Sequence, residues 1–340
     1  MVIALKVEKK HAEKARRFLI SKKLINFNYN PSSDNEFIFF PLDENIEERM
    51  EELNQLDFKF ELCKKRLRKK ENKKVSLPPF DIIGDVAIFE LPKEYKDLSE
   101  KQKENISKKI ASDIMEQHKN IKSVAVKTGG IKGPFRIRSF KVVAGRHSTL
   151  TIHKEHGCRF KLDVSKAYYS PRLSYERKRI NSLVKDGETV FVPFAGVGPF
   201  ALIIAKNHPN SKVYANELNP DAYSYLIENI KLNKLTNVIP IPGDARDLLK
   251  KKEYEGVADR VIMPLPMSAD QFLDVAFYLV KNGGIVHFYH FTDSIENAEK
   301  IVNDAAKKQN KKIKILQSRL VRDYSPDIIE VVVDFQVLNI

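Results

Sequence analysis

A glycine-rich turn carries the first sign of chemistry in this 340-residue sequence. The apolar strand pattern at 189–192 runs into Pro193-Phe194-Ala195-Gly196-Val197-Gly198-Pro199-Phe200, and a helix pattern follows. Glycine lets the backbone approach a ligand closely at such a turn. The next strand pattern ends in Glu217, where a carboxylate can accept hydrogen bonds from both hydroxyls of a ribose. The spacing predicts a site for a nucleoside-bearing cofactor at Phe194, Gly196, Gly198 and Glu217.

Two further strand patterns end in groups suited to the same cofactor. Residues 238–241 are followed by Pro242-Gly243-Asp244, and residues 258–263 by Pro264-Leu265-Pro266. Because the carboxyl ends of parallel strands meet at one edge of a sheet, we expect Asp244, Pro264 and Pro266 beside the glycine turn. The glycine pattern alone also fits nicotinamide enzymes. Four strand ends in this order favour an adenosine held edge-on, with a methyl donor facing the last loop.

The elements that must position these groups predict an α/β protein. From about residue 170 onward, strand and helix patterns alternate, which is typical of a doubly wound, mostly parallel sheet of the Rossmann-like type. The patterns at 312–316 and 328–338 predict a closing hairpin. Before that region, strand patterns at 85–91, 123–127, 140–144 and 158–163 accompany an amphipathic helix at 99–117.

The first 60 residues predict a separate small α/β module. Its patterns indicate strands at 2–7 and 36–40 and helices at 10–23 and 43–56. A basic run and Leu77-Pro78-Pro79 follow. We therefore expect four parts, which are an N-terminal domain at 1–62, a basic linker at 63–79, a middle α/β domain at 80–168 and the cofactor-binding domain at 169–340.

The charge balance predicts a polyanionic partner. The sequence has 59 Lys and Arg against 45 Asp and Glu, a net charge of +14. RNA, DNA and an anionic membrane surface all fit this surplus. Basic residues are concentrated at 64–74 and at 127–146, and the first of these runs is as compatible with a solvated tether as with direct RNA contact.

Composition argues against several other classes. No run approaches 18 apolar residues and the first residues soon become charged, so we expect a cytoplasmic protein without a membrane span. Cys63 and Cys158 are far apart, which predicts neither a disulfide framework nor a zinc site. His153 and His156 lack a third ligand in a metal-binding pattern, so we expect no metal and instead an RNA contact or hinge around Lys154.

Several motifs together resemble a known family. They are Phe80-Asp81-Ile82-Ile83-Gly84-Asp85, Phe135-Arg136-Ile137-Arg138, Thr151-Ile152-His153-Lys154-Glu155-His156-Gly157, Ser170-Pro171-Arg172-Leu173-Ser174-Tyr175-Glu176-Arg177 and the glycine turn. In this order, and over essentially the whole chain, they resemble the archaeal and eukaryotic tRNA (guanine-37-N1)-methyltransferase family. The resemblance implies S-adenosyl-L-methionine as cofactor and tRNA as partner. It also implies a first domain at the tRNA elbow, two further domains around the anticodon stem and loop, and a monomer as a sufficient unit.

The same resemblance implies roles for individual residues. The catalytic carboxylate of the family falls on Glu176, and the arginine that faces the base oxygen falls on Arg136. Loss of the N1 proton of guanine needs a base, and the charge that grows on O6 needs a cation. Without the resemblance, Glu176 reads as a surface ion pair and Arg136 as part of a basic strand face. Further RNA contacts are expected at Tyr168, which offers an aromatic face, and at Lys64, Arg66, Arg68, Lys154 and Arg172.

Two departures from the family pattern bear on the substrate. The family usually has an aspartate where this chain has Val192, and Asn-Leu-Pro where it has Pro264-Leu265-Pro266. The change resembles the archaeal branch that methylates guanine N1 and also C7 of the tricyclic intermediate 4-demethylwyosine. Three alternatives remain: aminocarboxypropyl transfer to that intermediate, a non-catalytic tRNA-binding protein with a decayed cofactor site, and a nicotinamide oxidoreductase, for which no hydride-handling residue is present.

Overall fold

The structure is a computed structural model that describes residues 1–68, 77–95, 97–133, 135 and 137–338. Its internal contacts divide the chain into two units, Met1–Ser76 and Leu77–Ile340. Arg136 and the lysines of 69–74 lie outside the described residues.

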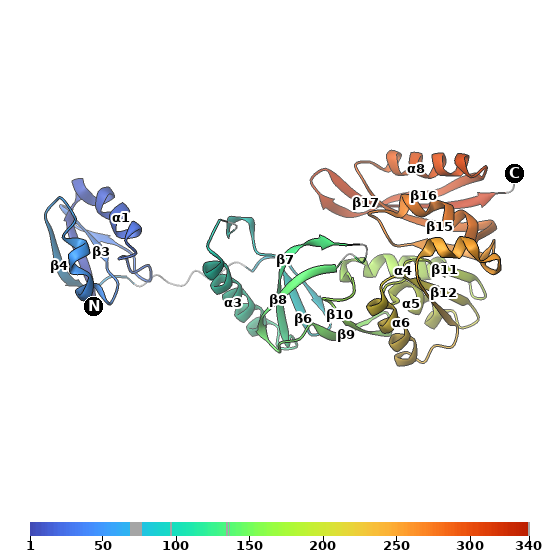
Figure 1. Cartoon of the computed structure of the whole chain (residues 1–340), viewed down its shortest axis with the longest axis horizontal. Coiled ribbons are helices and arrows are strands. Elements are labelled where there is room, and N and C mark those ends of the chain that lie inside the picture. The colour runs from blue at the N-terminus through green and yellow to red at the C-terminus, as the bar shows by residue number, and fades with distance from the viewer. Residues whose placement is uncertain (69–76, 96, 134, 136, 339–340) are drawn as a thin grey trace. The chain divides into compact units, whose positions relative to one another are not determined.

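The first unit is a four-stranded sheet covered by short helices (Figure 1). The strand order is β2-β3-β1-β4, and β1 is antiparallel to both of its neighbours. The strands are β1 (Val2–Glu8), β2 (Ser32–Ser33), β3 (Phe37–Pro41) and β4 (Phe60–Lys65), and the helices are α1 (Ala12–Ser21) and α2 (Met50–Leu53). Leu5 and Val7 of β1 and Leu19 of α1 share one buried apolar cluster that holds the unit together.

Two expectations about this unit were wrong in detail. The helix expected at 43–56 is a 3-10 turn at Ile46–Arg49 followed by α2, so only its middle is helical. The linker does not begin at residue 63, because Cys63 and Lys65 belong to β4 and pair with Ala4 and Val2. Leu67 is also buried, beside Ala4. The lysines at the end of β4 suggested a linker in the sequence, although the backbone of β4 pairs with β1.

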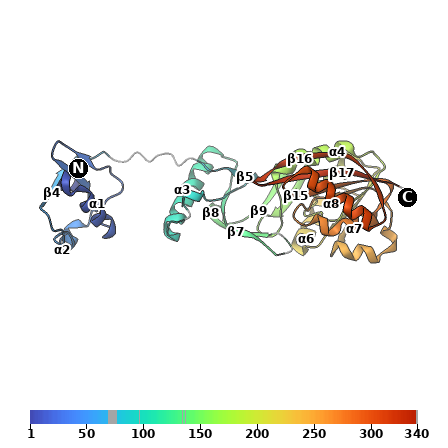
Figure 2. The ribbon, with the colours of Figure 1, turned by 90° about the horizontal axis from the view of Figure 1, so that it is seen from above.

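The second unit begins with a four-stranded sheet in the order β5-β6-β7-β8. The strands are β5 (Phe80–Ile83), β6 (Val86–Phe89), β7 (Ser123–Lys132) and β8 (Ile137–Gly145). The helix α3 (Glu100–Gln117) connects the parallel strands β6 and β7. It begins with a capping box, in which Ser99 and Gln102 each bond the backbone amide of the other. Figure 2 shows α3 on the side of this sheet that faces away from the C-terminal sheet.

A hairpin of β9 (Leu150–Glu155) and β10 (Cys158–Asp163) follows this sheet. Its turn is formed by His156 and Gly157, both with positive φ. Cys158, Phe160 and Leu162 face the helices of the C-terminal sheet and lie in the same buried cluster as those helices. The expected boundary at 168/169 therefore does not separate two cores, because the apolar side of β10 belongs to the C-terminal one.

The C-terminal part is the predicted doubly wound sheet, with seven strands in the order β13-β12-β11-β14-β15-β17-β16. The first five of these are parallel and β17 is antiparallel to both neighbours. The strands are β11 (Thr189–Val192), β12 (Lys212–Glu217), β13 (Val238–Pro242), β14 (Ala258–Met263), β15 (Val280–Thr292), β16 (Lys312–Ser325) and β17 (Ile328–Leu338). The closing hairpin is thus confirmed, although β16 continues nine residues beyond the expected Leu316.

Helices cover both faces of this sheet. They are α4 (Ser174–Leu183), α5 (Pro199–Asn207), α6 (Pro220–Leu232), α7 (Leu273–Leu279) and α8 (Ile295–Lys308). Short turns of 3-10 helix also occur elsewhere in the described chain, at Lys9–His11, Lys93–Tyr95, Pro171–Leu173, Ala245–Lys250, Lys252–Tyr254 and Ala269–Phe272. Along β11 the side chains alternate, so Val190 and Val192 join the cluster of α4, α5 and α6 while Phe191 joins that of α7 and α8. Figure 1 shows α4 and α8 on opposite sides of the strands β15–β17.

Candidate active site

A cavity of about 390 Å³ lies at the carboxyl edge of β11, β12, β13 and β14. The order of the strands reverses between β11 and β14, and ligands of such sheets bind at this reversal. Of the residues predicted to bind a cofactor, the cavity is lined by Phe194, Gly196, Glu217, Asp244 and Pro264. The structure therefore brings together four strand ends that the sequence predicted to meet.

Glu217 is fixed at the end of β12 by backbone amides. Its Oε2 accepts a hydrogen bond from the amide of Gly196 at 2.6 Å, and its Oε1 accepts one from the amide of Asn219 at 2.7 Å. Burial raises the pKa of Glu217, although the amides of Asn219 and Gly196 act in the opposite direction. Each carboxylate oxygen keeps a second lone pair, so the group fits the two hydroxyls of a ribose.

The walls of the cavity suit a flat aromatic ring system. Phe194 meets Phe272 edge-to-face at 4.9 Å between ring centroids, and the Arg246 guanidinium lies 4.1 Å from the Phe272 centroid. Asp244 begins the turn after β13, and its Oδ1 accepts a hydrogen bond from the Arg246 amide at 2.8 Å. Its side chain is partly exposed, so it can still accept a hydrogen bond from an exocyclic amino group.

Gly198 and Pro266 do not line the cavity. Gly198 begins α5 with φ of +94°, and a Cβ there would lie 2.4 Å from Leu202 Cδ1 and 2.7 Å from Leu226 Cδ1. Its missing side chain lets α5 and α6 approach each other. The carbonyl of Pro266 accepts a hydrogen bond from the amide of Phe291 at 2.8 Å, which ties the loop after β14 to the end of β15. Both residues shape the loops of the site from outside its lining.

Glu176 is fully buried on the first turn of α4 and lines neither this cavity nor the one described next. Its Oε2 accepts hydrogen bonds from the Tyr289 hydroxyl at 2.8 Å and from Arg179 Nε at 2.9 Å. Its Oε1 accepts none from the residues that the structure describes, although Arg319 Nη1 lies 3.0 Å away. Arg319 also contacts the exposed Tyr175. Arg319 therefore connects the buried Glu176 to the exposed Tyr175.

A network of buried polar side chains extends from Glu176 across the sheet. Arg179 Nη1 donates to Asp334 Oδ2 of β17 at 2.6 Å, and Asp334 Oδ1 lies 2.6 Å from His287 Nδ1 on β15. His287 Nε2 lies 2.7 Å from a guanidinium nitrogen of Arg260, which also forms a bidentate ion pair with Glu188. Burial lowers the pKa of His287, which keeps the imidazole neutral. This network of side chains fixes α4, and with it Glu176, to β14, β15 and β17.

We expect Asp334 to make the stability of the protein depend on acid. Burial opposes ionisation, but His287 and Arg179 outweigh it and lower the pKa of Asp334 from 3.8 to about 2. A carboxyl with a lowered pKa stabilises the fold above its unfolded pKa, and this contribution is lost as the pH falls through the folded value. The loss should be about 2 kcal/mol between about pH 5 and about pH 2.

Urea unfolding of the wild type and of Asp334→Asn over that pH range measures this contribution. The difference in unfolding free energy between the two proteins should shrink by the stated amount as the pH falls. The exposed Asp327→Asn in the turn between β16 and β17 is the control and should show no such trend. A constant difference for Asp334→Asn would contradict the lowered pKa.

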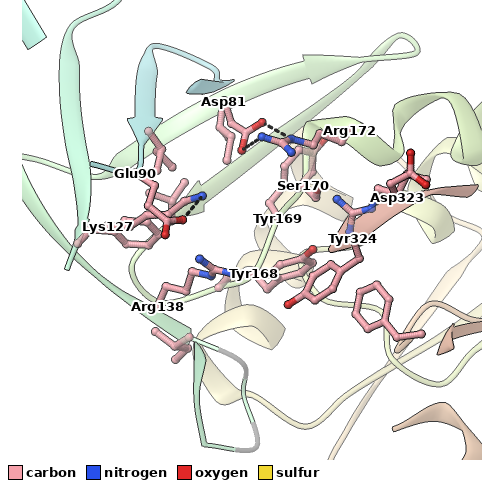
Figure 3. Close-up of a pocket in the computed structure, with 18 residues that line it drawn as sticks. Asp81, Glu90, Lys127, Arg138, Tyr168, Tyr169, Ser170, Arg172, Asp323 and Tyr324 are labelled. Carbon is pink, nitrogen blue, oxygen red and sulfur yellow. Dashed lines mark hydrogen bonds and ion pairs between the residues drawn. The ribbon is translucent and has the colours of Figure 1, made fainter. Parts of the chain in front are cut away.

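A second cavity of about 400 Å³ lies between the β5–β8 sheet and the C-terminal sheet (Figure 3). Tyr168, 40% exposed, lines both cavities and thus stands where they meet. Phe135 lines the first cavity next to the position of Arg136, which lies outside the described residues. An acceptor base placed against Tyr168 would therefore have the cofactor cavity beside it.

The other predicted RNA contacts lie in different settings. Arg172, in the 3-10 turn before α4, donates two hydrogen bonds of 2.7 and 3.2 Å to Asp81 and joins that turn to the β5–β8 sheet, while its side chain stays 53% exposed (Figure 3). Lys154 is exposed on β9. Lys64, Arg66 and Arg68 alternate with less exposed residues at the end of the first unit and present their side chains to solvent.

Sequence reasoning missed Glu155, the centre of the motif at 151–157. It is 8% exposed and accepts two hydrogen bonds from Arg177, at 2.6 and 2.7 Å, and one from the Tyr169 hydroxyl at 2.6 Å. The neighbouring His153 Nδ1 accepts a hydrogen bond from the Gly84 amide. The motif thus joins the β5–β8 sheet, the hairpin and α4. The sequence signal was weak, because the buried side of β9 carries the polar Thr151 and the arginine partner of Glu155 lies 22 residues later.

In the part of the chain that the structure describes, no three His, Cys, Asp or Glu side chains are grouped so that they could hold a metal ion. None of the helices in that part is long and apolar enough to cross a membrane.

Comparison with known proteins identifies the family. Residues 4–51 match the tRNA methyltransferase 5 N-terminal domain, residues 59–149 the TYW2 N-terminal domain and residues 151–316 the TRM5/TYW2 methyltransferase domain. The chain is 38% identical to the tRNA (guanine(37)-N(1))-methyltransferase Trm5b of Pyrococcus abyssi, over 99% of both chains. The chain belongs to the TRM5/TYW2 methyltransferase family.

Other relatives in the TRM5/TYW2 family act on wyosine precursors. The tRNA(Phe) (4-demethylwyosine(37)-C(7)) aminocarboxypropyltransferase of Methanocaldococcus jannaschii is 40% identical over 74% of this chain and 95% of its own. The tRNA (guanine(37)-N(1))/4-demethylwyosine(37)-methyltransferase Taw22 of Nanoarchaeum equitans is 33% identical over 65% of this chain and 86% of its own.

Solved structures of TRM5/TYW2 proteins share the fold. The complex of aTrm5 with tRNALeu has a TM-score of 0.67 and 34% identity, covering 99% of this chain and 100% of that one. TYW2 of Methanocaldococcus jannaschii in complex with AdoMet has a TM-score of 0.59 and 34% identity, covering 77% of this chain and 100% of that one. These values support the Rossmann-like fold preceded by N-terminal domains.

Proposed function

We propose that this protein transfers a methyl group from S-adenosyl-L-methionine to N1 of guanine at position 37 of tRNA. The observation that carries the proposal is the cavity at the strand reversal, with Glu217, Asp244 and Phe194 around it and Tyr168 at its border with a second cavity. The full-length similarity to Trm5b and the AdoMet complex of a related TYW2 support the same donor and acceptor. The net charge of +14 suits a tRNA partner.

The side chains divide the task between binding and proton transfer. Glu217 holds the ribose, Asp244 the amino edge and Phe194 a face of the adenosine, so that the sulfonium supplies its methyl carbon to the base. The target base must leave the anticodon loop stack before it can reach the cavity, and Tyr168 offers it an aromatic face. Glu176 accepts the N1 proton, and Arg136 stabilises the charge on O6.

Glu176 must become accessible before it can act. It is fully buried, and Arg319, which contacts Tyr175, lies 3.0 Å from its Oε1. Arg319 is 27% exposed, so a phosphate of the bound RNA can attract its guanidinium away from the carboxylate. Arg179 is bonded to Asp334, so it keeps its place when Arg319 moves and continues to orient Glu176.

Methyl incorporation tests the proposal. Purified full-length protein and radiolabelled S-adenosyl-L-methionine are incubated with a tRNA transcript that carries guanine at position 37 and with the same transcript carrying adenine there. We expect label in the first transcript and none in the second. Equal label in both would place the methyl group elsewhere, and no label in either, with cofactor binding confirmed by calorimetry, would contradict a tRNA methyltransferase.

Replacing Glu217 by alanine should weaken cofactor binding about 10- to 100-fold, because two hydrogen bonds to a charged acceptor are lost. Titration calorimetry with S-adenosyl-L-methionine measures the change. The exposed Glu253→Ala in the 3-10 turn Lys252–Tyr254 is the control and should bind as the wild type does. An unchanged dissociation constant for Glu217→Ala would remove the ribose role.

A second acceptor, C7 of 4-demethylwyosine, is favoured by two substitutions. Val192 is fully buried at the end of β11 and Pro264 lines the cofactor cavity, and both stand where the family usually has polar residues. Of the two, only Pro264 lines the cavity, and a less polar wall there accepts a larger, less polar base more readily. Wild-type protein is offered tRNA with 4-demethylwyosine at position 37, and the product is weighed. A gain of one methyl group supports this activity, a gain of an aminocarboxypropyl group supports the rival transfer, and no gain leaves guanine as the only acceptor of the two.

We also propose that Lys64, Arg66 and Arg68 of the first unit contact tRNA. They are exposed and alternate along one edge of the chain. Changing all three to glutamine should weaken tRNA binding and reduce the slope of log affinity against log salt by about 2 to 3, because each phosphate contact contributes about 0.7 to 0.9 to that slope. Filter binding at several salt concentrations measures the slope. An unchanged slope would mark this segment as a tether.

A further inference from the structure

The second cavity holds more positive charge than its acidic neighbours neutralise. Figure 3 shows Lys127 and Arg138 on neighbouring strands of the β5–β8 sheet, with their cationic ends directed into the cavity. Asp81 is already bonded to Arg172, and Asp323 lies on the opposite side of the cavity from Lys127 and Arg138.

The charges of Lys127 and Arg138 have little compensation from the protein. Lys127 Nζ lies 3.9 Å from Glu90, at the limit of an ion pair, and its side chain is 21% exposed. Arg138 is half-buried and has no hydrogen bond or ion pair with any residue that the structure describes. Burial and the neighbouring Arg138 charge lower the pKa of Lys127. Two half-buried cations beside each other, one of them with Glu90 at the limit of an ion pair, form a site that can accept a further anion.

Aromatic faces line the same cavity. Tyr324, near the end of β16, is 44% exposed, and its ring centroid lies 4.2 Å from that of Phe291. Tyr168 lies close to Tyr324 in Figure 3 and also lines the cofactor cavity. Exposed aromatic rings next to cations are the two elements that single-stranded RNA needs, for its bases and its phosphates.

We propose that this cavity binds a nucleotide that flanks the methylated base in the anticodon loop. Its phosphodiester lies between Lys127 and Arg138, and its base stacks on Tyr324. The inference rests on the proposed function, because Tyr168 separates this site from the cavity assigned to the cofactor. The site holds the neighbour of the target base while the target itself occupies the other side of Tyr168.

A phosphate scan tests the proposal. Anticodon stem-loop RNAs are prepared, each with one uncharged methylphosphonate linkage in the loop, and their binding to full-length protein is measured with S-adenosylhomocysteine present to prevent turnover. We expect one linkage close to position 37 at which the wild type loses affinity about tenfold. Arg138→Gln should lose about as much affinity for unmodified RNA and should be indifferent to the change at that linkage.

Two controls separate binding from folding. The exposed Lys101→Gln on α3 removes the same charge from the same sheet region and should respond to every linkage as the wild type does. Arg138→Gln should melt at the same temperature as the wild type or higher, because it removes repulsion from Lys127. The stacking role is tested by Tyr324→Ala, which should lose about tenfold in affinity, and by Tyr324→Phe, which should not.

The outcomes are distinct. If Arg138→Gln binds as the wild type does, or loses the same further affinity at every linkage, the cavity does not hold a phosphate. If Tyr324→Ala binds unchanged, no base stacks there. Methylation of unmodified tRNA by the wild type is measured in parallel, so a protein that binds as expected but never methylates guanine 37 would contradict the proposed function and not the phosphate site.

Discussion

Replacing Glu176 by glutamine is expected to reduce the rate of methyl transfer about 10²- to 10⁴-fold, because the group that accepts the N1 proton is lost. Glutamine has nearly the same shape, and its carbonyl can still accept the hydrogen bond from Tyr289 that reaches Glu176 in the wild type. Single-turnover kinetics with saturating cofactor and tRNA measure the chemical step directly. The affinity for S-adenosyl-L-methionine should not change, since Glu176 does not line the cofactor cavity.

The charge balance around Glu176 makes a stability control necessary. Arg179 and Arg319 both face this buried carboxylate, so Glu176→Gln leaves excess positive charge and lowers the melting temperature. The experiment is therefore run below the melting transition of the variant, with the partly buried Glu299→Gln on α8 as control. A folded Glu176→Gln protein that transfers methyl groups within about threefold of the wild-type rate would exclude Glu176 as the base.

The second large effect is on stability, from Glu155→Ala. This substitution leaves Arg177 buried without its carboxylate partner, and breaking a buried ion pair in this way costs about 3–5 kcal/mol. It also removes the acceptor of the Tyr169 hydroxyl, next to Tyr168 in the chain. Urea unfolding measures the free energy, and Glu299→Ala should change it by less than about 0.5 kcal/mol.

A partial rescue separates the charge of Glu155 from its packing. In the double variant Glu155→Gln with Arg177→Met, both charges are absent and most of the volume is kept. It should be more stable than Glu155→Ala, because no uncompensated charge remains. If Glu155→Ala loses less than about 1 kcal/mol, the buried pair does not hold the hairpin to α4.

The cofactor half of the site was predictable because it depends on local order in the chain. Glu217 and Asp244 each follow an apolar strand pattern, and the rule that parallel strands end at one edge places them together. The doubly wound sheet was predictable for the same reason, since its strands and helices alternate. Gly198 was assigned to the cofactor because a glycine motif does not reveal which of its members faces the ligand and which faces a neighbouring helix.

The remainder depends on pairings between distant segments. Two of the partners of Glu176, Tyr289 and Arg319, lie on β15 and β16, more than 100 residues away, and no spacing rule links them to it. The strand nature of Cys63–Lys65 was hidden because backbone pairing with β1 tolerates exposed lysines. The hydrogen bonds from Arg172 to Asp81 join residues 91 positions apart, which no local pattern reveals.

The most direct test of the central claim is the identity of the nucleoside that carries the methyl group. tRNA transcript with guanine 37 is incubated with the protein and deuterated-methyl S-adenosyl-L-methionine, digested to nucleosides and separated by mass spectrometry against standards. We expect 1-methylguanosine with a deuterated methyl group, in the fragment that contains position 37, and its near absence with Glu176→Gln. A deuterated methyl group on another atom or in another fragment would contradict it.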